Sequence, residues 1–147
     1  MQASASMPVF ARPVEIDGRH YLDGGLTDCI PLKFIQRMGY RRNVVVLTQP
    51  LDYRKRQAHV GWVMKMFLGD YPKVAQLMAH RHVMYNGELD YLHSEAQKGD
   101  TFLIYPDEKL NIGRLSLKED KMRRVYEAGV AKATALLPQI KRFLAGE

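Results

Sequence analysis

One short stretch near the N-terminus combines residue types that could carry out acid–base chemistry. The chain runs Tyr21-Leu22-Asp23-Gly24-Gly25, so a carboxylate follows an apolar run and precedes two glycines. Consecutive glycines let the backbone turn sharply, so we expect Asp23 to project from a corner at the end of a strand. A carboxylate positioned at such a corner, with few solvating neighbours, can act as a general base.

A base of this kind would activate a hydroxyl nucleophile. Serine attacks an ester efficiently only when a base lies within hydrogen-bond reach. Ser4 and Ser6 are the serines near the corner, but neither lies in the G-x-S-x-G elbow that exposes a nucleophile, and that motif is absent from the sequence. The sequence therefore predicts a base without its nucleophile.

The order of these features resembles the patatin-like acyl hydrolases, specifically the C-terminal part of the bacterial phospholipases of this type. Small residues and serines lead into Met7-Pro8, an apolar strand, the D-G-G triplet and a Pro-Leu helix start. The resemblance implies that Asp23 is the base of a Ser–Asp dyad and that Gly24 and Gly25 form the turn after it. It also implies a lipid ester substrate, such as a phospholipid or lysophospholipid acyl chain.

The resemblance is specific over about residues 3 to 50 and looser over 51 to 146, where it includes Arg81-His82 and Tyr85-Asn86. It implies an α/β protein: residues 1–147 would be the C-terminal portion of a single three-layer α/β/α patatin-like domain. The nucleophile elbow and the glycine-rich oxyanion loop are both missing. We therefore expect the N-terminal half of the same domain as a partner, an active parent enzyme, and an inactive chain on its own.

Composition leaves other classes of function open. A non-catalytic α/β binding or assembly module derived from the same fold is the main alternative. The net charge of +6 could favour nucleic acid or lipid headgroups, but the basic residues are dispersed and no RNA-binding signature accompanies them, so we expect no nucleic acid partner. The sequence shows no signal peptide, and its single Cys29 permits no internal disulfide. These features favour a cytoplasmic location, with peripheral membrane contact as an option.

No cofactor or metal is implied by the resemblance or by the histidines. His80 and His82 are two residues apart on an expected helix and would lie on different faces. Cys29 could be a stabilised thiolate near a helix start, but its apolar neighbours favour a structural thiol.

The sequence predicts that the elements which position Asp23 are alternating strands and helices. Asp17-Gly18 between two short runs predicts a hairpin of residues 14–16 and 20–22. Further strands are expected over 9–10, 43–48 and 101–105, and helices over 31–38, 58–68, 72–98 and 116 to the C-terminus. The β-branched run over 43–48 indicates a strand of a parallel sheet that is buried on both faces. A sheet with so few strands would have open edges, which also predicts missing partner strands.

Four positions predict where the expected helices begin, end or are interrupted. Ser116 and Glu119 have capping-box spacing, so Ser116 is expected as the N-cap of the last helix. Pro138 should break or kink that helix, Asn86-Gly87 could interrupt the helix over 72–98, and Asp28 is expected to open the helix over 31–38.

The segment Trp62–Leu68 suits either a core helix or a helix that contacts acyl chains or a membrane surface, and core packing is favoured.

Overall fold

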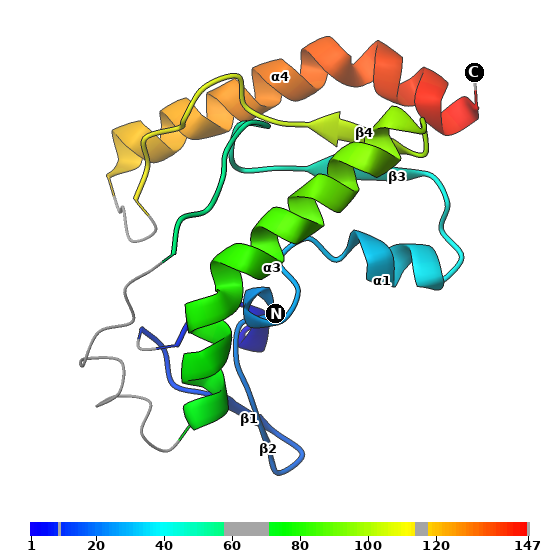
Figure 1. Ribbon diagram of the computed structural model, residues 1–147. Coiled ribbons are helices and arrows are strands. Elements are labelled where there is room, and N and C mark those ends of the chain that lie inside the picture. Colours follow the sequence, from blue (N-terminus) through cyan, green and yellow to red (C-terminus); the bar gives the residue numbers. More distant parts are fainter. Residues whose placement is uncertain (9, 58–70, 114–117, 147) are drawn as a thin grey trace. The chain divides into compact units, whose positions relative to one another are not determined.

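The computed structural model describes residues 1–8, 10–57, 71–113 and 118–146. Its elements in chain order (Figure 1) are η1 (Ala3–Ala5), β1 (Val14–Ile16), β2 (Arg19–Tyr21), η2 (Gly24–Leu26), α1 (Leu32–Arg37), β3 (Asn43–Val46), α3 (Pro72–Gln97), β4 (Thr101–Ile104) and α4 (Glu119–Ala145). This mixture confirms the general α/β class. The expected helix over 58–68, with Trp62–Leu68, lies outside the described residues.

The chain divides into two compact units, which are described separately. The first comprises residues 1–31 and 54–91, and the second comprises 32–53 and 92–147, so α3 contributes to both. The described helices include none with the length and apolar character needed to cross a membrane.

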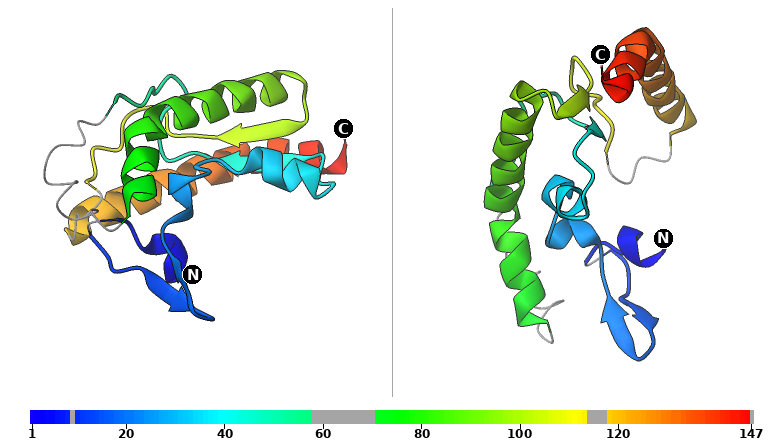
Figure 2. Two further views of the ribbon diagram at one scale, coloured as in Figure 1. Left: turned by 60° about the horizontal axis from the view of Figure 1, so that its bottom comes forward. Right: turned by 90° about the vertical axis from the view of Figure 1, so that its right-hand side faces the viewer.

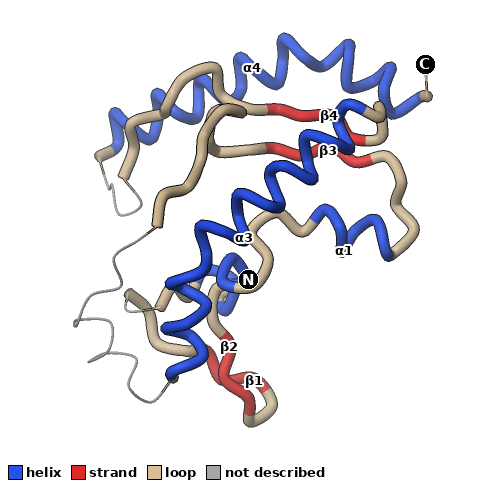
Figure 3. Tube along the Cα trace, in the orientation of Figure 1, coloured by secondary structure: helices blue, strands red, loops and turns tan. Residues whose placement is uncertain are grey.

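The first unit contains the predicted β-hairpin. β1 and β2 pair antiparallel with Val14 opposite Tyr21, and Figure 3 shows the two short strands joined by a tight turn. Asp17 and Gly18 both have positive φ, 50° and 71°, as the type I′ turn of a two-residue hairpin requires. β2 ends at Tyr21, so Asp23 lies beyond the ladder, as the sequence predicted.

The strand expected over 9–10 is wrong at Phe10. Phe10 lies in a turn, where its N–H donates to the Met7 carbonyl at 3.2 Å. Val9 lies outside the described residues.

α3 is one continuous helix of 26 residues, and Asn86-Gly87 does not interrupt it. Pro72 occupies its first position, where the missing N–H costs nothing, and Gly99 follows its end with φ of 82°. Leu89 and Leu92 are fully buried on this helix. The apolar positions at helical spacing therefore outweigh the turn tendency of Asn-Gly.

The second unit is built on a two-stranded parallel sheet, with Asn43 opposite Thr101 and Val46 opposite Ile104. The pairing continues beyond β3 through the Leu47 N–H, which donates to the Ile104 carbonyl at 2.8 Å. The parallel arrangement confirms part of the prediction. Burial on both faces is wrong, because Val46 is 67% exposed, and within the described residues no third strand joins this sheet.

α4 runs alongside β4, as Figures 1 and 2 show. The Phe102 and Phe143 rings meet with centroids 5.7 Å apart, and Lys132 donates to Asp107 at 2.6 Å. These contacts attach the helix to the strand and to the loop that follows it.

The structure differs from two predictions about α4. Its N-cap is Lys118, without a side-chain cap, whereas the predicted N-cap, Ser116, lies outside the described residues. The helix continues through Pro138 to Ala145, so the predicted break is wrong, while a kink there stays a prediction. A proline removes one intrahelical hydrogen bond and its ring clashes with the preceding turn, but the remaining turns and the packing on β4 keep the helix continuous.

Candidate active site

Asp23 lies between the hairpin and η2, at the corner that the sequence predicted. Its Oδ1 accepts a hydrogen bond from the Gly25 N–H at 2.8 Å, and its own N–H donates to the Ser6 carbonyl at 2.9 Å. Oδ2 makes no hydrogen bond to any residue in the described part of the chain. One carboxylate oxygen is thus held by the turn, and the other is left to accept a proton.

Ser6 is brought beside Asp23 through its backbone and has a structural role in this arrangement. Its side chain is buried, and its hydroxyl donates to the Gln2 carbonyl at 3.0 Å. The hydroxyl therefore stabilises the N-terminal turn, which agrees with its exclusion as a nucleophile.

The two glycines after Asp23 are not equivalent. A Cβ built on Gly25 would lie 2.9 Å from Arg81 Nη2 and 3.1 Å from Asp23 Oδ1, whereas one built on Gly24 meets nothing within 4 Å. A side chain at Gly25 would therefore crowd the Arg81 guanidinium and the Asp23 carboxylate, which would have to shift, whereas Gly24 has open space. Nothing in the sequence distinguishes the two positions.

Helix α3 holds the segment after Asp23 through two oppositely charged side chains. Arg81 Nε donates to the Gly25 carbonyl at 2.7 Å, and Glu88 Oε2 accepts from the backbone N–H groups of Cys29 and Ile30, both at 3.0 Å. Residues seven apart on a helix lie two turns apart on about the same face. Sequence reasoning missed Glu88 entirely and included Arg81 only within the looser resemblance.

The Glu88 carboxyl is electrostatically perturbed. Burial raises its pKa above the ordinary 4.5 and the neighbouring Asp28 carboxylate adds to this, while the Ile30 and Cys29 N–H groups act in the opposite direction. Asp28 does not open a helix, since α1 begins only at Leu32. It lies instead in the segment that Glu88 anchors.

Cys29 belongs to the same segment. Its half-buried Sγ donates to the Gly25 carbonyl at 3.0 Å. A thiol with a hydrogen-bond partner inside the fold agrees with a structural role. The Gly25 carbonyl therefore accepts from both Arg81 and Cys29.

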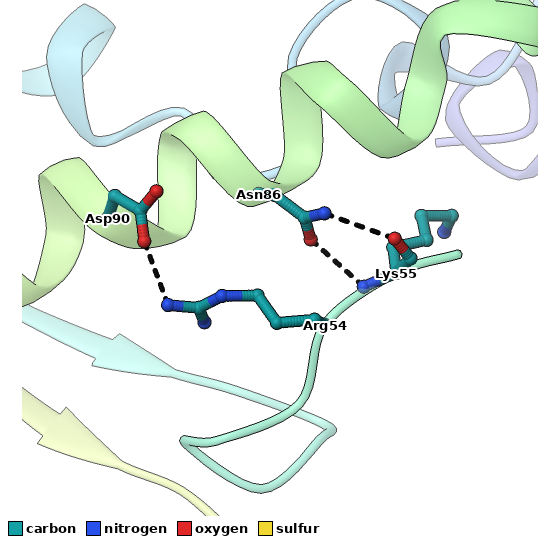
Figure 4. A network of polar contacts seen from close by, with 4 residues as sticks. All are labelled: Arg54, Lys55, Asn86 and Asp90. Carbon is teal, nitrogen blue, oxygen red and sulfur yellow. Dashed lines mark hydrogen bonds and ion pairs between the residues drawn. The ribbon is translucent and has the colours of Figure 1, made fainter. Parts of the chain in front are cut away.

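A second polar network joins the loop after residue 53 to α3 (Figure 4). Asn86 accepts from the Lys55 N–H at 2.9 Å and donates to the Lys55 carbonyl at 3.0 Å, and Arg54 pairs with Asp90 at 2.8 Å. The Lys55 ammonium also lies 5.2 Å from the centroid of the Tyr85 ring. Part of the basic run Arg54–Arg56 thus anchors a loop to the helix that also holds the Asp23 corner.

Two of the histidines of α3, His80 and His82, bond to their own helix. His80 Nδ1 contacts the Gln76 carbonyl at 2.9 Å and His82 Nδ1 contacts the Ala79 carbonyl at 3.0 Å. Within the described ranges, no three His, Cys, Asp or Glu side chains are grouped to hold a metal ion.

Comparison with known proteins separates the chain into two matched regions. Residues 1–34, which include the Asp23 corner, match the model of the patatin-like phospholipases. Residues 71–145, about half of the chain, match the model of a domain of unknown function (DUF6363), and the chain belongs to this family. The DUF6363 match covers the whole of α3, β4 and α4.

A curated relative resembles nearly the whole chain. The chain is 31% identical over 135 residues to the uncharacterized protein YjjU of Escherichia coli (strain K12), an alignment that covers 88% of this chain. It spans only 37% of that relative's length. The matched features are therefore set within a longer polypeptide in the relative.

Proposed function

We propose that this chain is the C-terminal portion of a patatin-like serine hydrolase that cleaves carboxylic ester bonds of lipids, with Asp23 as the base. The observation that carries this proposal is the Asp23 corner within the region that matches patatin-like phospholipases. One oxygen of its carboxylate is fixed by Gly25, and the other lacks a partner in the described part of the chain. An oxygen without a hydrogen bond is able to accept a proton from a serine hydroxyl that lies within hydrogen-bond reach, which supports the proposal.

In the proposed reaction, Asp23 Oδ2 accepts the proton of a serine hydroxyl as that oxygen attacks the ester carbonyl. Collapse of the tetrahedral intermediate breaks the bond to the alcohol, which leaves with the proton from Asp23 and gives an acyl-serine. Water then attacks the acyl-serine and transfers its proton to Asp23. The fatty acid and the free serine are released, and the serine recovers the proton.

The nucleophile and the oxyanion donors belong, in this proposal, to the missing N-terminal half of the domain. Two observations support it: the parallel sheet of the second unit has an exposed Val46, and the curated relative is much longer than the match. Parallel sheets are usually covered on both faces. The completed domain would be a three-layer α/β/α patatin-like fold, with peripheral contact at the cytoplasmic membrane surface where phospholipid substrates lie.

The test is Asp23→Asn in the full-length protein, assayed with a p-nitrophenyl ester and with a lysophospholipid. Asparagine keeps the shape but cannot accept the serine proton, so we expect the rate to fall about 10²–10⁴-fold at an unchanged melting temperature. Asp17→Asn is the matched control, since Asp17 lies in the hairpin turn, where asparagine readily adopts a positive φ.

The outcomes separate the proposal from its alternative. Wild-type activity in Asp23→Asn would exclude Asp23 as the base. A full-length protein without hydrolase activity would favour the alternative that the fold serves as a binding or assembly module.

A further inference from the structure

Arg81 reaches from α3 to the Asp23 corner and contacts Gly25. It is half-buried, it donates Nε–H to the Gly25 carbonyl at 2.7 Å, and its Nη2 lies against the Gly25 Cα. A hydrogen bond from a guanidinium is charge-assisted and roughly twice as strong as a neutral one. This contact therefore fixes Gly25 firmly on α3.

Gly25 is in turn the residue that orients the Asp23 carboxylate. Its N–H donates to Asp23 Oδ1 at 2.8 Å, so the position of this N–H sets the direction in which Oδ2 is presented. If Gly25 shifts or rotates, the carboxylate loses its hydrogen bond and gains rotamer freedom. The orientation of Asp23 thus depends on the side chain that holds Gly25.

We propose that Arg81 is a positioning residue of the Asp23 base, acting through Gly25 to keep Oδ2 directed at the serine hydroxyl. This inference rests on the proposed function. Arg81 does not contact the reacting atoms: its side chain makes no ion pair with Asp23 among the described residues. Its effect should appear in the chemical step and leave substrate binding unchanged.

Glu88 attaches the other end of the segment after Gly25 to α3. The effect of Arg81 on the Asp23 corner can therefore be separated from the attachment of the whole segment. Glu88 binds the backbone of Cys29 and Ile30, four and five residues beyond Gly25, and these contacts do not involve Arg81. Removal of the Arg81 side chain should therefore loosen the corner while the chain remains attached to α3. This separation makes an effect on catalysis measurable without unfolding.

The experiment uses the full-length protein with Arg81→Gln, Arg81→Lys, Asp23→Asn and Arg123→Gln. Arg123 is the matched control because it lies on α4 and pairs with the exposed Glu119. We measure kcat, KM and melting temperature with a p-nitrophenyl ester. A small misplacement of a catalytic group costs up to about 10²-fold, so Arg81→Gln should lower kcat about 10- to 100-fold with KM within about twofold. Arg81→Lys, which keeps the charge, should recover part of that loss.

Each result supports or overturns the positioning role of Arg81. Wild-type kcat in Arg81→Gln, with an inactive Asp23→Asn, overturns the role of Arg81 and leaves the proposed function standing. Wild-type activity in Asp23→Asn overturns both. If Arg81→Gln does not fold, Arg81→Lys decides: a reduced kcat at unchanged KM and melting temperature supports the proposal, and a loss that only follows the melting temperature overturns it.

Discussion

At the scale of single residues, the Asp23 corner depends on contacts that are distant in sequence. Asp23 is found where D-G-G placed it, because a turn between a strand and two glycines is a local property. The unequal roles of Gly24 and Gly25 are not local, since Gly25 is constrained by Arg81, 56 residues away. Glu88 was missed for the same reason: its partners are backbone N–H groups 58 and 59 residues away, and nothing about a lone glutamate identifies them.

The two buried or paired glutamates of α3 should titrate in opposite directions. Burial, followed by the Asp28 charge, raises the pKa of Glu88, whereas hydrogen bonds from Lys98 and then Gln36 lower the pKa of Glu95. Glu88 therefore contributes its full stability below its ordinary pKa of 4.5 and loses it as the pH rises through the raised folded value. Glu95 contributes stability above 4.5 and loses it as the pH falls through its lowered value.

This prediction is checked with the variants Glu88→Gln and Glu95→Gln. The stability of the wild type relative to Glu88→Gln should decrease as the pH rises, and its stability relative to Glu95→Gln should increase. NMR titration of the two carboxyl carbons gives the pKa values directly. A midpoint for Glu88 at or below the ordinary value would contradict the burial argument.

At the scale of elements, the sequence predicted which segments are helices and strands better than where they end. The Asp17-Gly18 hairpin and the stop of α3 at Gly99 follow from backbone conformations that a single residue type supplies. The predicted break at Pro138 is wrong and the N-cap of α4 is Lys118, because the capping box and the proline are both local tendencies that the packing of α4 on β4 can override. Burial on both faces was inferred from the β-branched run over 43–48, but such a run is a local pattern and does not determine whether another layer covers the second face, where Val46 is exposed.

Asn86 shows how α3 stays continuous through an Asn-Gly pair. Its side chain bonds to the backbone of Lys55 on both sides and so does not compete for the backbone of its own helix. Asn86→Ala gains helix propensity but loses both bonds, each with a net value of about 1 kcal/mol. We expect a net loss of roughly 1 kcal/mol in the free energy of unfolding, with faster proteolysis near Lys55.

Gln76→Ala is the control for this prediction. It also changes a carboxamide to alanine on α3, at an exposed position, and it should leave stability unchanged or slightly higher. Equal stability of the two variants would show that the Asn86 contacts contribute nothing.

At the scale of the whole molecule, the described chain contains the proposed base Asp23 and the contacts that hold it, within a region that matches patatin-like phospholipases. The α/β class and the short match to patatin-like phospholipases agree with the resemblance read from residues 3 to 50. The DUF6363 region was reached only by the looser part of the resemblance, which included Arg81-His82 and Tyr85-Asn86. The contacts of Arg81 and Glu88 in this region are with residues 56 to 59 positions away in sequence, so no local motif marks them.

The chain alone should therefore have no esterase activity. Acyl transfer requires a nucleophile and oxyanion donors, and a base without them cannot replace either. The measurement is hydrolysis of a p-nitrophenyl ester by the purified chain, with the full-length protein as the positive control. Turnover by the chain that is abolished by Asp23→Asn or Ser6→Ala would show that it contains a complete site.

The two-stranded sheet of β3 and β4 also bears on how the chain behaves in solution. Its outer edges carry backbone donors and acceptors without a strand beside them in the described part of the chain. Unpaired edges of this kind can recruit strands from other molecules, so we expect the separately expressed chain to self-associate as its concentration rises. If the proposed N-terminal half covers such an edge, expression of the two together should reduce this association.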